Sequence, residues 1–262
     1  MSIVTPLFSN EERIKLKQYI TKMKFDKEMS LRDTMVCGYL DICRSPLKGI
    51  GQYISEPETS TTVRDAFVEK PFTSAIYSLI EQKDDYDDWH KRLCNKIISH
   101  YFEFGYPWFT YGKAQKWINM TMKYIMLYNS EYSEKLKEYI PVFHVPIDRY
   151  IAPSIAKMIH YLPKDIETRQ FGILDASFDS QKANYCWSKI DDYDDYLKCQ
   201  IKLREALDPE GLPPLRWEFD EWIKAKREKE LYDAKSSKED YQRRMCCKMI
   251  FSVSSVLKSS TT

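Results

Sequence analysis

The pattern of apolar and polar residues is helical along most of the chain. Apolar side chains recur three and four residues apart, and alternation with a period of two is nearly absent. This spacing predicts amphipathic helices rather than strands. The segments that carry it are 11–23, 64–82, 87–104, 113–128, 131–139, 149–161, 189–207, 216–235 and 238–250. We therefore expect an all-α fold.

Prolines and acidic residues indicate where these helices begin and end. The acidic stretch 84–88 precedes one predicted helix, where negative charge suits the helix N-terminus. Pro71 is expected to break or start the helix over 64–82, and the prolines of 141–146 predict an extended segment there. Two further segments, 45–62 and 163–185, are predicted to be a loop and an irregular stretch.

The chain has 262 residues, enough for one domain with a substantial core. It shows no internal repeat, so we expect a single compact helical domain over 1–262 with a frayed tail over about 251–262. The first residues lack a signal-peptide pattern, and no stretch approaches the length of a transmembrane helix. A protein that is not secreted and stays out of membranes is expected, in the cytoplasm, nucleoid or nucleus.

Composition excludes several kinds of site. The chain has only 7 glycines and contains neither a G-x-G-x-x-G nor a P-loop motif, so these nucleotide sites are not expected. Its 7 cysteines form no C-x-x-C pair and its 4 histidines have no metal-ligand spacing, so no metal is expected. A net charge of +1 means that any contact with DNA needs a local patch.

One region carries more specific information. Residues 104–120 read Phe-Gly-Tyr-Pro-Trp-Phe-Thr-Tyr-Gly-Lys-Ala-Gln-Lys-Trp-Ile-Asn-Met, a short aromatic hairpin followed by a helix that opens with Gly-Lys. Later, residues 144–148 read His-Val-Pro-Ile-Asp and lead into the helix predicted over 149–161. Lys116 precedes Asp148 by 32 residues, and Lys113 precedes it by 35.

These residues resemble the helix-hairpin-helix DNA glycosylases, and specifically the archaeal type of 8-oxoguanine glycosylase. The family places a lysine at the start of the second hairpin helix and an aspartate after a Val-Pro-Val-Asp-like segment. The matching residues are Lys116, or alternatively Lys113, and Asp148. The family's Gln-Lys pair and its long insert between the two catalytic residues are matched as well. The resemblance spans about 90–160, with the helix-hairpin-helix over about 90–128, but the hairpin lacks the usual Gly-x-Gly.

The resemblance implies a lysine nucleophile without a metal or organic cofactor. A lysine amine can attack C1′ of a nucleoside and leave a Schiff base, but only when it is unprotonated. Burial or a neighbouring cation lowers a lysine pKa, and Lys113 is placed to supply that cation to Lys116. A carboxylate such as Asp148 can stabilise the developing positive charge on the sugar and move protons.

Both residues also have an ordinary structural interpretation. Lys113, Lys116 and Lys123 share a stripe opposite an apolar one, which is typical of a solvated helix face. Asp148 is placed to cap the helix that follows. If Pro153 occupies the first helical position, however, Ala152 becomes the cap and Asp148 lies outside the helix.

DNA binding needs further contacts. Backbone N–H groups near Gly112 and Lys113 are candidates for holding a phosphate, with Gln115 beside them. Trp108 is a candidate for a wedge or a stacking platform, although core packing is the more common role of such aromatic residues. In the archaeal relatives the C-terminal helix contacts the base, which points to Asp220 and Trp222 here. Further candidates for neutralising the DNA backbone are Lys123, Arg149 and Lys157.

The function that these observations favour is excision of a damaged or modified base from DNA, with possible lyase activity after it. Two alternative functions are compatible with the same helical fold but involve no base excision. One is a nucleic-acid-binding or defence-associated module in which Lys116 contacts phosphate. The other is a protein–protein interaction domain that uses the tyrosine- and tryptophan-rich surface.

Overall fold

The computed structural model describes residues 7–9, 11–12, 14, 28–43, 62–164, 166 and 187–228. The regular elements in these ranges are helices and they form no sheet, which confirms the all-α prediction. By the contacts within the chain, residues 1–221 form one compact unit and residues 222–262 another. In the described ranges, no helix is long and apolar enough to cross a membrane.

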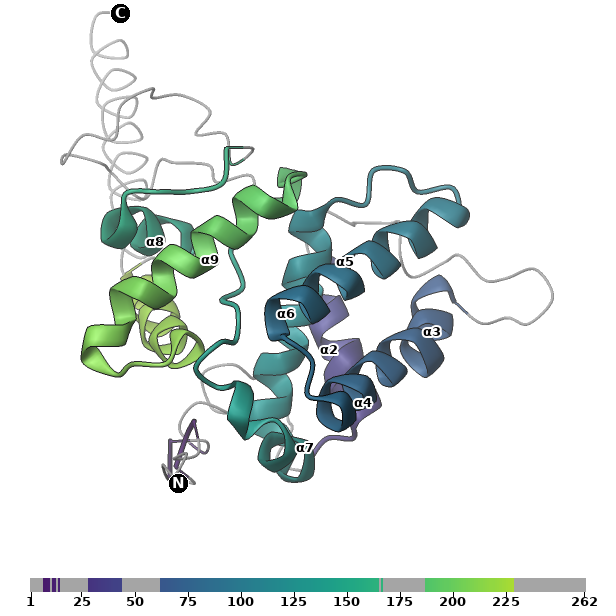
Figure 1. The fold of residues 1–262 in the computed structure, drawn as a ribbon, viewed down its shortest axis with the longest axis horizontal. Helices are drawn as coiled ribbons and strands as arrows, with labels where there is room; N and C mark the ends of the chain where they lie inside the picture. Colours follow the sequence, from purple (N-terminus) through teal and green to yellow (C-terminus); the bar gives the residue numbers. More distant parts are fainter. Residues whose placement is uncertain are drawn as a thin grey trace, which may run out of the picture. The chain divides into compact units, whose positions relative to one another are not determined.

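Figure 1 labels the α-helices α2 to α9, which all belong to the first unit together with four short 3-10 or π-helical elements. They are α2 (Leu31–Cys43), α3 (Val63–Phe67), the π-helical turn η1 (Val68–Phe72), α4 (Thr73–Gln82), α5 (Tyr86–Glu103), α6 (Tyr111–Tyr128), α7 (Ser130–Lys135), η2 (Lys137–Tyr139), α8 (Ala152–Ile159), η3 (Trp187–Lys189), α9 (Tyr193–Leu207) and η4 (Asp208–Glu210). Residues 214–221 are also helical in this unit, and residues 222–228 are helical in the second.

Helix α6 is the central element of the first unit. It packs against α2, α5, α7 and η3, and α2 makes the most extensive of these contacts. Figure 1 shows α6 between the group α2–α5 and the pair α8 and α9. The close approach of α2 depends on Gly38, because a Cβ there would lie 2.6 Å from Thr121 Oγ1. The sequence therefore places a residue without a side chain where two helix backbones meet.

Aromatic side chains fill the space between α6 and the helices around it. Trp117 is fully buried and makes ring contacts with Tyr39, Phe67, Phe72 and Tyr101. Its indole N–H donates to the Met35 carbonyl oxygen at 2.9 Å, so the polar group of this residue is also satisfied. This cluster fixes α6 within the core.

The predicted start of α5 agrees with its cap, whereas α8 begins at Ala152 and α9 at Tyr193 rather than at the predicted 149 and 189. Asp85 accepts a hydrogen bond from the Asp88 N–H at the start of α5, as its acidic lead-in predicted. Asp192 accepts from two N–H groups at the start of α9. Pro71 lies in η1, where the widened π-helical turn joins α3 to α4 and interrupts the α-helical pattern at the predicted place.

Helix α2 was not predicted. Ser30 caps it, since its Oγ accepts from the Asp33 N–H at 3.1 Å and donates to the Asp33 carboxylate. The residues on its buried face are Leu31, Thr34, Met35, Gly38, Tyr39 and Ile42. Their spacing is helical, but a threonine and a glycine within it weaken the apolar signal in the sequence.

Some of the predicted segments reach beyond the described residues. Of the helix predicted over 11–23, residues 11, 12 and 14 are described and are helical. Nearly all of the predicted loop 45–62 and much of the irregular stretch 163–185 lie outside the described residues. The helix predicted over 216–235 is described as far as 228, and the segments 238–250 and 251–262 lie outside.

Candidate active site

The three lysines of α6 lie inside the protein. Lys113, Lys116 and Lys123 are 7%, 8% and 3% exposed, because α6 is covered on every side. The interpretation of these lysines as a solvated basic face is therefore wrong. Buried lysines need partners for their charge, and each of the three amines has one in the first unit.

Lys116 and Asp148 meet as an ion pair. Lys116 Nζ lies 3.1 Å from Asp148 Oδ2, although the residues are 32 positions apart in the sequence. The side chains are 10% and 12% exposed, so the pair is nearly enclosed but retains a narrow contact with solvent. An amine and an acid predicted from separate segments are thus direct neighbours.

Asp148 lies in the turn before α8 rather than within the helix. Its second oxygen, Oδ1, accepts the backbone N–H groups of Tyr150 at 2.8 Å and Ile151 at 3.1 Å. Burial opposes ionisation of this carboxyl, but the Lys116 charge and the two N–H groups outweigh it and hold its pKa below the ordinary value. Pro153 occupies the first turn of α8, which explains why Asp148 lies outside it.

Two side-chain amides hold the extended segment that carries Asp148. Gln115 donates to the Ile147 carbonyl oxygen at 3.2 Å and accepts from the Ile147 N–H at 3.4 Å. Gln200 of α9 makes the same pair of hydrogen bonds with Val145, at 3.0 and 2.9 Å. The amides replace the neighbouring strand that an isolated extended segment lacks. Gln115 is fully buried. Its hydrogen bonds to Ile147 hold the segment that places Asp148 beside Lys116.

A buried polar network continues from these amides. Asn119 donates to Gln115, and also to the hydroxyl of Tyr196, which in turn contacts His144 Nδ1 at 3.1 Å. His90 lies against His144 with a ring-centroid distance of 4.4 Å and bonds Asn119 through Nε2. Within the described ranges, no group of three or more histidine, cysteine or acidic side chains is placed to hold a metal ion.

The indole of Trp187 covers the other side of the Lys116 amine. Its ring centroid lies 4.3 Å from Nζ, within the range of a cation–π interaction. The short helix η3 that carries Trp187 is fixed to the start of α6, where the Gly112 N–H donates to the Ile190 carbonyl oxygen at 2.8 Å. Gly112 is required here, since a Cβ would lie 2.0 Å from the Trp187 carbonyl oxygen.

A second buried ion pair lies further along α6, and the sequence analysis did not predict it. Lys123 Nζ contacts both carboxylate oxygens of Glu218 at 2.8 and 2.6 Å, with side chains only 3% and 2% exposed. Burial raises the pKa of Glu218, and the negative charge of Asp148 acts in the same direction. Lys116 and Asp148 are therefore close enough to Glu218 for the two pairs to interact.

The other residues predicted to bind DNA do not gather around Lys116 and Asp148. The Lys113 amine donates to the Trp108 carbonyl oxygen at 2.6 Å, and burial lowers its pKa. Trp108 is 49% exposed, unlike its neighbour Phe109, which is 3% exposed. Asp220 is exposed and pairs with Arg216 at 3.4 Å on its own helix. Trp222 belongs to the second unit, where its ring contacts Lys226.

The backbone at the start of α6 is already hydrogen-bonded. The N–H groups of Gly112 and Lys113 donate to Ile190 and Thr110 within the protein. A phosphate held by these two N–H groups would have to displace both hydrogen bonds. Arg149 and Lys157 are exposed, although the Arg149 guanidinium donates to the Tyr150 hydroxyl at 2.9 Å.

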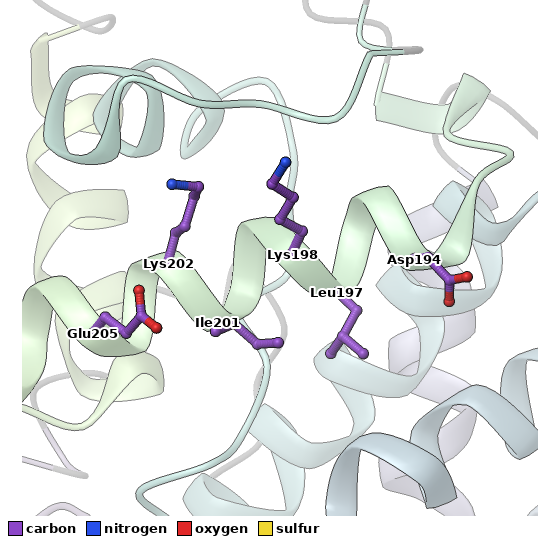
Figure 2. Close-up of a pocket in the computed structure, with 6 residues that line it drawn as sticks. All are labelled: Asp194, Leu197, Lys198, Ile201, Lys202 and Glu205. Atoms are coloured by element: carbon purple, nitrogen blue, oxygen red, sulfur yellow. The ribbon is translucent and has the colours of Figure 1, made fainter.

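A separate hollow lies on the outer surface of α9 (Figure 2). It measures about 450 Å³, and its lining residues come from this helix alone: Asp194, Leu197, Lys198, Ile201, Lys202 and Glu205. Figure 2 shows the side chains of Lys198 and Lys202 pointing to one side of α9 and those of Leu197 and Ile201 to the other. None of the residues predicted to form a site lines this hollow.

The chain was compared with family models, curated proteins and solved structures, and none of them matches it. The candidate active site is therefore defined by its own geometry. It consists of an amine from the first third of α6, an acid from the turn before α8, an indole from η3, and the amides that hold the acid in place.

Proposed function

We propose that the protein is a DNA glycosylase that excises a damaged or modified base, of the 8-oxoguanine type, with Lys116 as its nucleophile. The observation that carries the proposal is the ion pair between Lys116 and Asp148. The resemblance assigns a nucleophile and a charge-stabilising acid to these two residues, and it requires that they meet. Their buried contact at 3.1 Å satisfies that requirement.

The pair contains the groups that the reaction needs. Because Asp148 is ionised in the free protein, the proposed reaction begins only when the Lys116 ammonium passes a proton to this carboxylate; the free amine then attacks C1′ of the nucleotide. The bond from C1′ to the base breaks, its electron pair leaves with the base, and the base takes up a proton that Asp148 can deliver. In a further step the C1′–O4′ bond opens, O4′ gains a proton, the amine nitrogen loses one, and a Schiff base forms. While ionised, Asp148 also stabilises positive charge on the sugar.

DNA contacts are assigned to residues with exposed side chains. Arg149, next to Asp148, and Lys157 on α8 are exposed and can neutralise phosphates. Trp108 offers an exposed indole in the segment before α6, where it can stack on a base or enter the duplex. Lys113 and Lys123 are excluded from this role because their amines are engaged inside the protein.

The test is base release from oligonucleotides that carry 8-oxoguanine, uracil or a hypermodified cytosine. We expect the natural protein to release one of these bases, and Lys116→Gln to abolish release. Lys137→Gln, which changes an exposed lysine paired with Glu134, is the matched control and is expected to retain full activity. Base release that persists in Lys116→Gln would contradict the proposal. Salt-dependent DNA binding without release from any substrate would instead favour a non-catalytic nucleic-acid-binding module.

A further inference from the structure

The Lys116 amine is enclosed between an acid and an aromatic ring. Asp148 Oδ2 lies 3.1 Å from Nζ, and the centroid of the Trp187 ring lies 4.3 Å from the same atom. The side chain of Lys116 is 10% exposed, and Trp187 itself is 9% exposed. The opening that remains beside the amine is narrow, so a small molecule that is to form a bond with Nζ needs one of its neighbouring groups to move.

Trp187 is the neighbour that can leave this space without disturbing the acid. The backbone that follows it is anchored to the start of α6 by two hydrogen bonds, from Gly112 N–H to the Ile190 carbonyl oxygen at 2.8 Å and from Thr110 Oγ1 to the Ser188 carbonyl oxygen at 2.6 Å. Rotation of its side chain moves the indole and leaves both bonds intact. Asp148, by contrast, is held through two N–H groups at its carboxylate, so its movement would break them.

The indole also contacts the amine through the face of its ring, where the ring electrons attract a positive charge. An ammonium cannot act as a nucleophile, so the ring opposes reaction both by its position and by its electrostatics. Displacement of the ring removes both obstacles in one movement.

We propose that Trp187 is a gating residue for Lys116: its indole covers the amine in the free protein and is displaced when a planar base with its sugar enters. This inference rests on the proposed function for the identity of the ligand, a nucleoside with an electrophilic C1′. The contact between the indole and the Lys116 amine lies within the protein, so the covering of the amine can be tested without a DNA substrate.

The test is the rate at which Lys116 reacts with benzaldehyde in the presence of cyanoborohydride, measured by peptide mass spectrometry. Trp187→Ala is expected to raise the labelling rate of Lys116 about tenfold, because it removes both the cover and the cation–π contact. Trp187→Phe retains a smaller ring and is expected to give an intermediate rate. The exposed Lys137 serves as the internal standard, and its rate is expected to stay the same in every variant.

An unchanged labelling rate of Lys116 in Trp187→Ala would overturn the proposal. If that variant fails to fold, Trp187→Leu replaces it, since leucine fills part of the space without an aromatic face. A rate equal to that of the natural protein would then overturn the proposal as well. Failure of the proposed function looks different: no base is released from any oligonucleotide, while the labelling rates still depend on residue 187.

Discussion

The stability of the Lys116–Asp148 pair can be tested by a double-mutant cycle. Asp148→Asn keeps an oxygen that can accept the N–H groups of Tyr150 and Ile151, but it removes the charge opposite the amine. Breaking a buried ion pair from one side costs about 3–5 kcal/mol, because the remaining charge is left without its partner. The lower end, about 3 kcal/mol, is expected here, because the side chains keep 10% and 12% exposure and Trp187 still faces the amine.

The assay is urea denaturation of Asp148→Asn, Lys116→Met and the double variant. The double variant is expected to lose less stability than the sum of the single variants, by about 2 kcal/mol, because neither charge is left alone in it. The control is Glu131→Gln, whose partner Lys135 belongs to an exposed pair and which should cost less than about 1 kcal/mol. A loss in Asp148→Asn as small as that of the control would refute the view that this pair is buried and coupled.

Three further predictions follow from buried groups. Burial lowers the pKa of both His90 and His144, so the unfolded chain binds more protons near pH 6.5 and the free energy of unfolding should fall below that pH. Urea midpoints that stay constant between about pH 8 and pH 5.5 would contradict this. Gly112→Ala should cost about 1–3 kcal/mol in the same denaturation assay, because its Cβ meets the backbone of η3; full stability would show that η3 is not fixed there. Glu218→Gln removes the charge opposite Lys123 and should cost about 3–5 kcal/mol in thermal or urea unfolding, whereas a near-neutral effect would indicate that the pair is hydrated.

Local signals in the sequence account for much of the helical framework. The acidic lead-in with Asp85 and the proline at 71 depend only on neighbouring residues, and they predicted where helices start or change. The expectation that Ala152 caps α8 was wrong, since Ile151 occupies that position. Helix α2 was not predicted, because a glycine within a helix weakens the helical pattern. The reason for Gly38 is the close approach of α6, a contact between distant parts of the chain that the local sequence does not show.

The candidate site was predictable only in part. The resemblance brought Lys116 and Asp148 together, but periodicity alone favoured a solvated position for the lysine. The periodicity of one helix cannot show that it will be surrounded on all sides, as α6 is. The roles of Gln115, Glu218 and Trp187 likewise arise from tertiary contacts, since their partners lie between 32 and 95 positions away in the sequence.

Covalent trapping of the protein on DNA tests directly whether Lys116 is the nucleophile. The natural protein is incubated with an oligonucleotide that carries the excised base, borohydride is added, and the adduct is digested and mapped by mass spectrometry. The account predicts a reduced Schiff base on Lys116, and none at that position in Lys116→Gln. Base release that leaves an adduct on another lysine, or no adduct at all, would contradict it.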